Sequence, residues 1–273
     1  MIGRLDRVVN YAVLTAFSIV ALFPIVGLVL SALHPPSSLG GGFSLSGGIH
    51  FASFQRAWTE GHFATYLRSS VIVSLSVVAA ATLLSIMAGY AFGTMRFRGH
   101  KALFYLLLVG IMVPMEALIV PLYYDMRAAE LTDTYWALIL PQVGLSVAFG
   151  TFWMRAYFLT APRSLMEAAE LDGARPWAIL WRVLLPLGRP AVLTMTVLIF
   201  MWTWNEFLLA LVMVSSESLR TAPLGLAFFQ GQHVSNFALL AAGATIVSLP
   251  VVVLYIFLQR HFIRGMMSGA VKG

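Results

Sequence analysis

Six stretches of this chain are long and apolar enough to cross a lipid bilayer, and no other feature constrains the fold as strongly. A bilayer core about 30 Å thick requires roughly 20 mostly apolar residues in a helix that rises about 1.5 Å per residue. Within the bilayer the backbone must satisfy its own hydrogen bonds, which favours helices. The six stretches are residues 8–33, 67–92, 102–120, 134–158, 191–214 and 237–259. We therefore predict an all-α polytopic membrane protein with six transmembrane helices.

The third stretch is the shortest and contains Pro114 and Glu116. Proline is tolerated inside a span where neighbouring helices satisfy the carbonyl group that it frees. We therefore expect residues 102–120 to span as well.

Composition excludes a water-soluble protein. Apolar residues make up 60% of the chain and charged residues only 10%, and the mean hydropathy is +0.87. A soluble domain carries about 25% charged residues. The net charge of +6 is spread along the chain, which argues against a nucleic-acid partner. The chain has no cysteine, so disulfides and thiolate metal sites are excluded.

The basic residues predict the orientation, because cytoplasmic loops collect Lys and Arg. Thirteen of the seventeen basic residues lie on the side of the N-terminus and four on the opposite side. Six spans place both termini on one side, so we predict that both are cytoplasmic. The first span is about 26 residues long, which exceeds the apolar core of a signal peptide and favours a retained anchor.

Residues 1–66 contain the first span and a long external loop, which is interrupted by Pro35-Pro36 and by glycines 40–42. A short helix near residues 54–58 is expected to lie on the membrane. Residues 67–273 form the second predicted region, with five spans and one long cytoplasmic loop, residues 159–190.

The loop at residues 159–190 predicts two helices. The first covers residues 164–171 after Pro162 and ends at Gly173, because glycine enters the left-handed cap conformation without steric cost. The second begins at Pro176 and is expected to close at Pro186. Four apolar residues follow helical spacing on it, Trp177, Leu180, Trp181 and Leu184. Taken alone, this pattern fits equally an interfacial helix pair on anionic headgroups and a docking knob for another protein.

The same loop resembles a motif of bacterial ABC importer permeases. Glu167-Ala168-Ala169, three residues, Gly173, nine residues and 183-VLLP-186 match E-A-A-x3-G-x9-I-x-L-P, with Val183 in place of isoleucine. Further segments are similar to the carbohydrate branch and are nearest the maltose-type second permease: 88-AGYAF-92, 96-RFRG-99, 204-WNEFL-208, 224-LGL-226 and the tail 269-GAVKG-273. The likeness covers residues 65–273 closely and the first sixty loosely.

The resemblance implies a four-part importer in the bacterial cytoplasmic membrane, with a second homologous permease, a cytoplasmic ABC ATPase dimer and an extracytoplasmic sugar-binding protein. It also implies that Glu167, Ala168, Ala169, Asp172, Gly173 and Pro186 couple the permease to the ATPase. The sequence independently lacks a Walker A motif, since Lys101 follows His100 and Lys272 follows Val271. We therefore expect no cofactor on this chain, with ATP and Mg bound by the partner ATPase, and no enzymatic activity of its own. The glycine-rich tail is either disordered or inserted between the ATPase subunits.

Two carboxylates inside predicted spans, Glu116 and Glu206, are candidates for the transport pathway, because intramembrane charges are costly. If both face one cavity, they and Asn205 can hydrogen-bond sugar hydroxyls, with Trp202 or Trp204 as an apolar face. The alternative is interfacial snorkelling beside an aromatic belt.

Catalytic and metal motifs are missing from the sequence: no H-E-x-x-H or G-x-S-x-G occurs. We therefore do not expect a membrane-embedded hydrolase, and the resemblance implies an importer of a sugar or oligosaccharide. Glycerol-3-phosphate importers of the same branch look alike, but phosphate favours arginines in the core, which the predicted spans lack away from their ends. An ion-coupled secondary carrier usually shows inverted repeats, and none is found.

Overall fold

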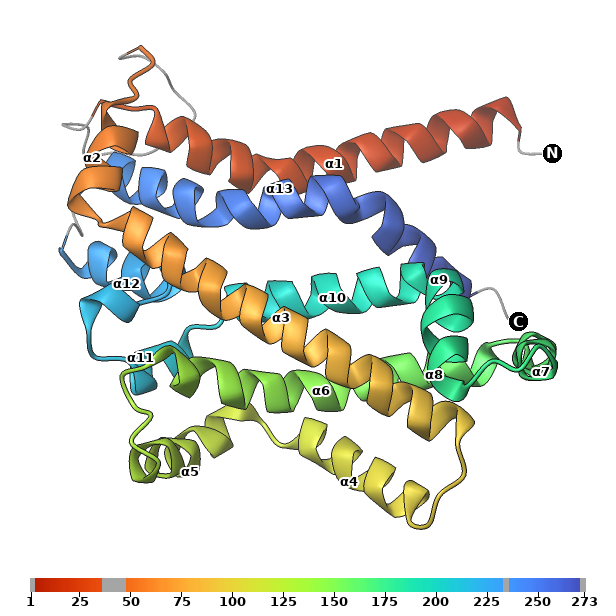
Figure 1. The fold of residues 1–273 in the computed structure, drawn as a ribbon. Coiled ribbons are helices and arrows are strands. Elements are labelled where there is room, and N and C mark those ends of the chain that lie inside the picture. Colours follow the sequence, from red (N-terminus) through yellow and green to blue (C-terminus); the bar gives the residue numbers. More distant parts are fainter. Residues whose placement is uncertain (1–2, 36–47, 233–235, 271–273) are drawn as a thin grey trace. The chain divides into compact units, whose positions relative to one another are not determined.

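The computed structural model describes residues 3–35, 48–232 and 236–270, and every regular element in those ranges is helical, which confirms the all-α prediction (Figure 1). The chain divides into two compact units. One comprises Met1–Thr65 with Leu224–Pro250, and the other Tyr66–Pro223 with Val251–Gly273. The glycines at 40–42 and the last three tail residues lie outside the described residues.

The first unit contains α1 (Arg4–Ala32), α2 (Ala52–Glu60), most of α12 (Ala222–Gln232) and the first half of α13 (Phe237–Ala270). Phe63 lies at its centre, with its ring edge-on to Phe229 at 5.3 Å between centroids. Gly243 leaves room for this ring, because a Cβ there would lie 3.0 Å from it. The helix expected near residues 54–58 is α2.

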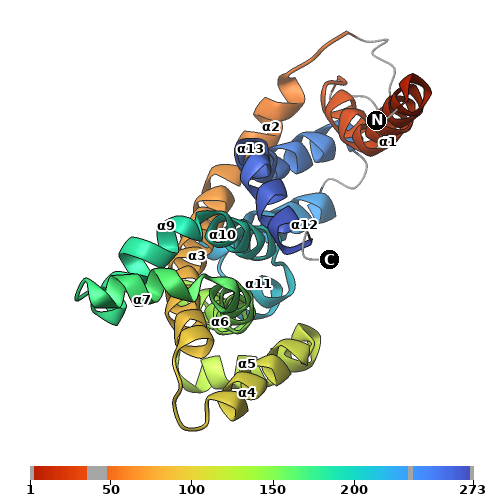
Figure 2. The same ribbon diagram turned by 90° about the vertical axis from the view of Figure 1, so that its right-hand side faces the viewer.

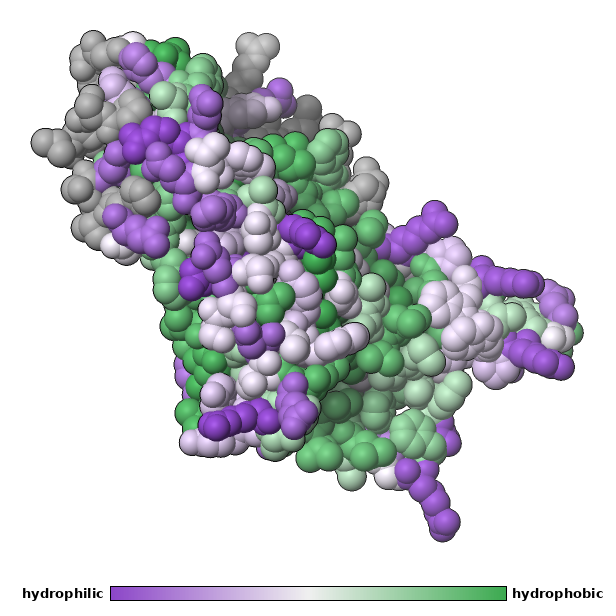
Figure 3. Space-filling view, turned by 60° about the vertical axis from the view of Figure 1, so that its left-hand side comes forward, coloured by the Kyte–Doolittle hydropathy of each residue, from purple (hydrophilic) through white to green (hydrophobic). Residues whose placement is uncertain are grey.

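Among the described residues, four helices are long and apolar enough to span a membrane, and they match four of the six predicted spans. They are residues Leu5–Ala32 of α1, α3 (Phe63–Thr94), α6 (Tyr135–Thr160) and Phe237–Gln259 of α13. The apolar window of α1 has none of its residues buried inside the protein. Large hydrophobic areas are exposed on the face shown in Figure 3. Such a surface is stable only against lipid or another apolar partner.

The third predicted span is not one helix but two, α4 (His100–Met112) and α5 (Met115–Ala128), bent by 101°. Pro114 lies at the break, and the two helices together are long and apolar enough for one broken span. Pro114 disfavours the helical conformation of the residue before it, and Val113 is extended, with ψ 121°. The freed backbone turns sharply, so α5 does not continue the direction of α4 (Figure 2).

The fifth predicted span is also interrupted. α10 (Arg189–Trp204) has 16 residues, and α11 (Leu208–Met213) begins only after residues 205–207. α10 instead follows a helical segment, Pro176–Leu187, from which it is bent by 82°. In the part of the chain that the structure describes, four continuous helices and two bent pairs are long and apolar enough to span a membrane, which gives six spans if each bent pair is one span.

Small residues join α3 to α6 in the second unit. A Cβ added to Gly89 would lie 2.5 Å from the Cβ of Met154, and one added to Gly150 would lie 2.7 Å from the Cβ of Ser85. A Cβ added to Gly93 would lie 2.8 Å from the Cβ of Phe158. Because these positions repeat every four residues on each helix, they form one continuous seam of close backbone approach.

Asp133 ties the start of α6 to the end of α11. Its backbone N–H donates to the Met213 carbonyl at 2.9 Å, and its carboxylate accepts the backbone N–H groups of Ser215 at 3.0 Å and Ser216 at 2.8 Å. The Ser216 hydroxyl donates to the same carboxylate. These bonds to the charged form, the Ser216 hydroxyl first, hold the pKa of Asp133 below its ordinary value.

Candidate functional site

The loop at residues 159–190 carries an exposed helix, α7 (Arg163–Leu171), that stands clear of the ends of α3, α6 and α10 in Figures 1 and 2. No residue of α7 is buried, and Leu171 is 90% exposed. Of the predicted coupling residues, Glu167, Ala168 and Asp172 are exposed and Ala169 is half-buried. The sequence motif therefore lies on a surface that another protein can reach.

The turn after α7 has the geometry that was predicted from Gly173. Its φ is +77°, and its N–H donates to the Glu170 carbonyl at 2.9 Å. The N–H of Ala174 donates to the Ala169 carbonyl at 2.9 Å. This pair of bonds is a Schellman cap, which satisfies the last carbonyls of the helix and reverses the chain. Nothing lies within 4 Å of a Cβ placed on Gly173, so the backbone conformation, and not crowding, requires glycine there.

The second helical segment runs through α8 (Pro176–Ala178), a π-helical turn η1 (Ile179–Leu184) and α9 (Leu185–Leu187). It ends one residue beyond Pro186, not at it as expected. The expected apolar stripe is not an outer face: Leu180 and Leu184 are fully buried, and Trp177 is exposed. A π-helical turn contains one residue more than an α-helical turn. Two successive residues, Ile179 and Leu180, are both buried here. The segment therefore docks inward and leaves α7 as the free surface.

Two tyrosines connect this segment to the span helices. The Tyr90 hydroxyl on α3 donates to the Pro176 carbonyl at 3.3 Å, and the Tyr157 hydroxyl on α6 donates to the Leu184 carbonyl at 2.7 Å. Gly188 makes the second contact possible, because a Cβ there would lie 2.5 Å from the Tyr157 ring. Pro186 lies exposed between these contacts. The hairpin, defined as residues 162–188, is thus tied to α3, α6 and α10 together.

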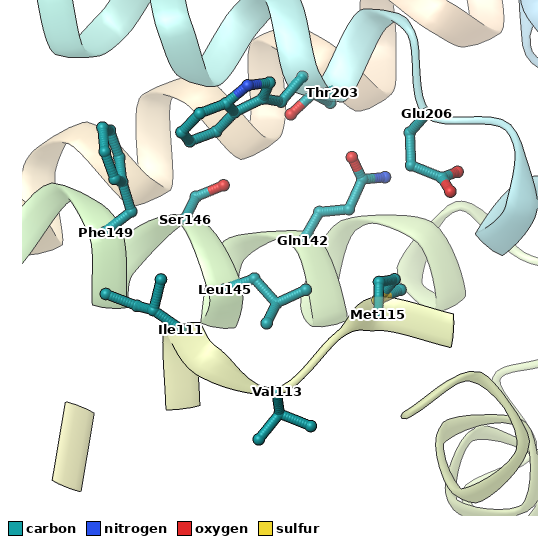
Figure 4. Close-up of a pocket in the computed structure, with 10 residues that line it drawn as sticks. Ile111, Val113, Met115, Gln142, Leu145, Ser146, Phe149, Thr203 and Glu206 are labelled. Carbon is teal, nitrogen blue, oxygen red and sulfur yellow. The ribbon is translucent and has the colours of Figure 1, made fainter. Parts of the chain in front are cut away.

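A cavity of about 270 Å³ lies between the α4–α5 break, α6 and the end of α10 (Figure 4). Ten residues line it: Ile111, Val113, Met115, Gln142, Leu145, Ser146, Phe149, Trp202, Thr203 and Glu206. Its volume is near the lower end of ligand pockets, which begin at about 300 Å³.

Of the five pathway residues predicted from sequence, the structure brings only Trp202 and Glu206 to this cavity. Trp204 is 2% exposed and stacks on Phe200 at 5.5 Å, so it belongs to the core. Asn205 donates its side-chain amide to the Met201 carbonyl at 2.8 Å, which ends α10. Glu116 is exposed in the first turn of α5 and does not line this cavity.

Glu206 has a structural role that the sequence reading missed. Its two carboxylate oxygens accept the backbone N–H groups of Leu209, at 2.6 Å, and Ala210, at 3.1 Å. Those N–H groups have no carbonyl partner at the start of a helix, so the carboxylate caps α11. An acidic residue in an apolar span is thereby satisfied where the span breaks.

Three polar cavity residues were also missed, Gln142, Ser146 and Thr203. Gln142 and Ser146 are four residues apart on α6 and therefore share one face. A hydropathy average over the whole span hides such a pair, but a polar pair at helical spacing inside an apolar run was a usable signal. Among the described residues, no group of three or more His, Cys, Asp or Glu side chains lies close enough to hold a metal ion.

Comparisons with known proteins agree with this geometry. Residues 81–268 match the family described as "Binding-protein-dependent transport system inner membrane component". The arabinooligosaccharides transport system permease protein AraQ of Halalkalibacterium halodurans is 36% identical over 259 residues, which cover 93% of this chain and 92% of that protein. The trehalose transport system permease protein SugB of Mycobacterium tuberculosis is 32% identical over 255 residues, or 93% of each chain.

A solved structure has the same fold. One chain of a bacterial ABC transporter involved in the import of the acidic polysaccharide alginate superposes with a TM-score of 0.78, and the match covers 96% of this chain and 99% of that one. The two sequences are 24% identical. This likeness shows that the overall fold of the chain is also found in an experimental structure.

Proposed function

Because the chain belongs to the family of inner membrane components of binding-protein-dependent transport systems, we propose that it is a permease subunit of an ATP-driven importer for a sugar or oligosaccharide. The observation that carries this proposal is the exposed hairpin at residues 162–188. It presents α7 and a Schellman turn at its tip, and its base is bonded to two span helices. A cytoplasmic partner that displaces this hairpin also displaces the span helices to which it is bonded.

The coupling step follows from these contacts. An ATPase dimer binds ATP and Mg and encloses α7 in a groove, where Ala168 and Ala169 allow close approach and Glu167 or Asp172 pairs with cationic groups. Closure of the ATPase displaces the hairpin. The hairpin is bonded to α3 and α6 and continues into α10, so these helices move together and the cavity changes its access from one side of the membrane to the other.

The orientation and the other partners complete the proposal. The distribution of basic residues supports cytoplasmic termini and a cytoplasmic hairpin. A second homologous permease shares the membrane domain, and an extracytoplasmic binding protein delivers the sugar. The relatives named for arabinooligosaccharides and trehalose support a carbohydrate substrate.

A glycerol-3-phosphate importer is the second candidate, and the cavity argues against it. None of the ten described residues that line the cavity is Lys or Arg, and one is Glu206. A phosphate dianion entering such a cavity would lose its hydration without gaining a cationic partner. A neutral sugar loses less hydration free energy, because it carries no charge.

Reconstitution tests the proposal. The chain is purified with its second permease and ATPase, inserted into proteoliposomes and supplied with the binding protein and internal ATP. Uptake of labelled arabinotriose or trehalose that requires both ATP and the binding protein supports the proposal. Uptake driven by a proton or sodium gradient without ATP, or uptake of glycerol 3-phosphate but of neither sugar, contradicts it.

A further inference from the structure

The cavity beside α6 contains two buried polar side chains whose hydrogen-bonding groups are not all used. Gln142 is 8% exposed, and one of its amide N–H groups donates to the Leu138 carbonyl at 2.9 Å. An amide has a second N–H and a carbonyl oxygen with two lone pairs. Neither has a partner among the described residues, and Figure 4 shows the side chain extending from α6 toward Thr203 and Glu206.

Ser146 is the second such group. It is 8% exposed, and its hydroxyl has no partner in the part of the chain that the structure describes, although serine in a helix can bond to the carbonyl four residues earlier. Ser146 lies one helical turn from Gln142 on the same face of α6. The polar atoms of Gln142 and Ser146 are not fully enclosed, so water or a polar ligand in the cavity can bind them. Two such side chains on one wall therefore make the cavity a place for a polar guest.

An aromatic ring from a second helix completes the lining: Trp202 lies on α10, whereas Phe149 shares the α6 face with Gln142 and Ser146. The rings of Phe149 and Trp202 meet edge to face at 4.6 Å between centroids, and both line the cavity. This contact holds the indole of Trp202 in place. A guest with polar edges and an apolar face matches a cavity with an amide and a hydroxyl from α6 and a fixed ring from α10.

The carboxylate of Glu206, which lines the cavity, already has hydrogen-bond partners. Both oxygens of Glu206 accept backbone N–H groups of α11, so this carboxylate acts as a cap and does not await a cation. An anionic guest would be repelled by it, and a neutral guest would not.

From these observations we propose that the cavity is a subsite for one neutral sugar unit. Gln142 and Ser146 hydrogen-bond the hydroxyls of that unit, and Trp202 covers its apolar face. This inference rests on the proposed importer function and adds to it that this subunit itself holds the sugar during transport. The helix spacing of Gln142 and Ser146 fixes two hydrogen-bonding groups about one turn apart, and the 270 Å³ volume admits one unit of a longer chain at a time.

The test measures sugar carried per ATP hydrolysed. The complete transporter in proteoliposomes is given binding protein, ATP and labelled arabinotriose, and uptake and ATP hydrolysis are followed in the same vesicles. Gln142→Met keeps the length and volume of the side chain and removes its amide; Ser146→Ala removes the hydroxyl. Each lost bond to a neutral partner lowers retention of the sugar, so we expect the sugar carried per ATP to fall about three- to tenfold with the ATPase rate within about twofold of wild type.

Ser248→Ala is the matched control. Its hydroxyl is exposed and bonds only to the Ala244 carbonyl of its own helix, at 2.8 Å, so both rates should stay unchanged. Gln142→Met can reduce the amount of assembled complex, and in that case Ser146→Ala and Ser146→Leu test the subsite instead. Ser146→Leu fills the cavity and should block sugar uptake while ATP hydrolysis continues.

Two outcomes overturn the subsite, and they are distinct from failure of the importer function. An unchanged ratio of sugar to ATP in the Ser146 variants, or a parallel fall of ATPase rate and uptake, shows that the cavity residues are structural only. Failure of the importer function appears instead in the wild-type protein, as no ATP-dependent uptake of a neutral sugar.

Discussion

The turn at Gly173 provides a sharp test of the coupling hairpin. Gly173 has φ +77°, and an alanine there would meet no atom within 4 Å. Its cost is therefore purely that of holding an L-residue in the left-handed region, about 1–2 kcal/mol. No residue of α7 is buried, so little packing resists local unwinding of this element. We expect Gly173→Ala to relieve the strain by opening the Schellman turn.

The size of the effect on ATPase binding follows from that cost. If the ATPase binds only the closed turn, a penalty of about 1–2 kcal/mol lowers the binding-competent fraction and weakens binding by about 5- to 30-fold. Gly173→Asn should weaken it less, because asparagine enters the left-handed region more readily than alanine. Binding of purified ATPase to the permease complex in nanodiscs, measured as Kd, gives both values.

Gly99 offers a matched control. It also has a positive φ, of +81°, it is also exposed, and a Cβ there also meets nothing within 4 Å, but it precedes α4 and lies outside the hairpin. Gly99→Ala should therefore carry the same conformational cost and leave the Kd unchanged. Unaltered ATPase binding by Gly173→Ala, or equal weakening by Gly99→Ala, would refute the argument.

Three further predictions concern stability and the connections of the hairpin. Gly89→Ala forces α3 and α6 apart and should cost about 1–3 kcal/mol in thermal unfolding of the purified complex, whereas Gly110→Ala, with no atom within 4 Å, should be neutral or slightly stabilising. Asp133→Asn should cost about 1 kcal/mol at pH 7. Because the pKa of Asp133 is lowered on folding, its contribution is present above the ordinary value near 4 and is lost as the pH falls through the lowered one, so the variant should show a flatter acid limb of Tm against pH. Tyr157→Phe removes the bond to the Leu184 carbonyl and should speed amide hydrogen exchange in residues 185–190, with no change expected in α5.

The parts of the fold that the sequence predicts well depend on local chemistry. The first helix of the hairpin was expected at residues 164–171 and is Arg163–Leu171, because Pro162 and Gly173 act on the backbone next to them. The long spans follow from the same logic, since an apolar run of about 20 residues has few other stable states in a bilayer.

The errors share a different cause. Pro114 was expected inside a span, and the 101° bend at it was not foreseen, because a bend depends on neighbouring groups that hydropathy does not include. The apolar stripe was assigned to a regular helix, but Leu180 and Leu184 lie in a π-helical turn, where both are fully buried. Gln142 and Ser146 were overlooked because a hydropathy average hides a polar pair, and the cavity that they line with Trp202 is a tertiary feature.

The glycine seam between α3 and α6 also sets the mechanics of the molecule. α3 and α6 approach closely at Gly89, Gly93 and Gly150, so neither helix can slide along the other without a steric clash. The two helices therefore move as one rigid body. α6 has 26 residues and is about 39 Å long at about 1.5 Å per residue. A tilt of about 5° at the hairpin end therefore displaces the far end by about 3 Å, which is the diameter of a water molecule. Because the seam keeps α3 and α6 together, a small displacement of the hairpin moves the far ends of both helices enough to open or close a path for solvent.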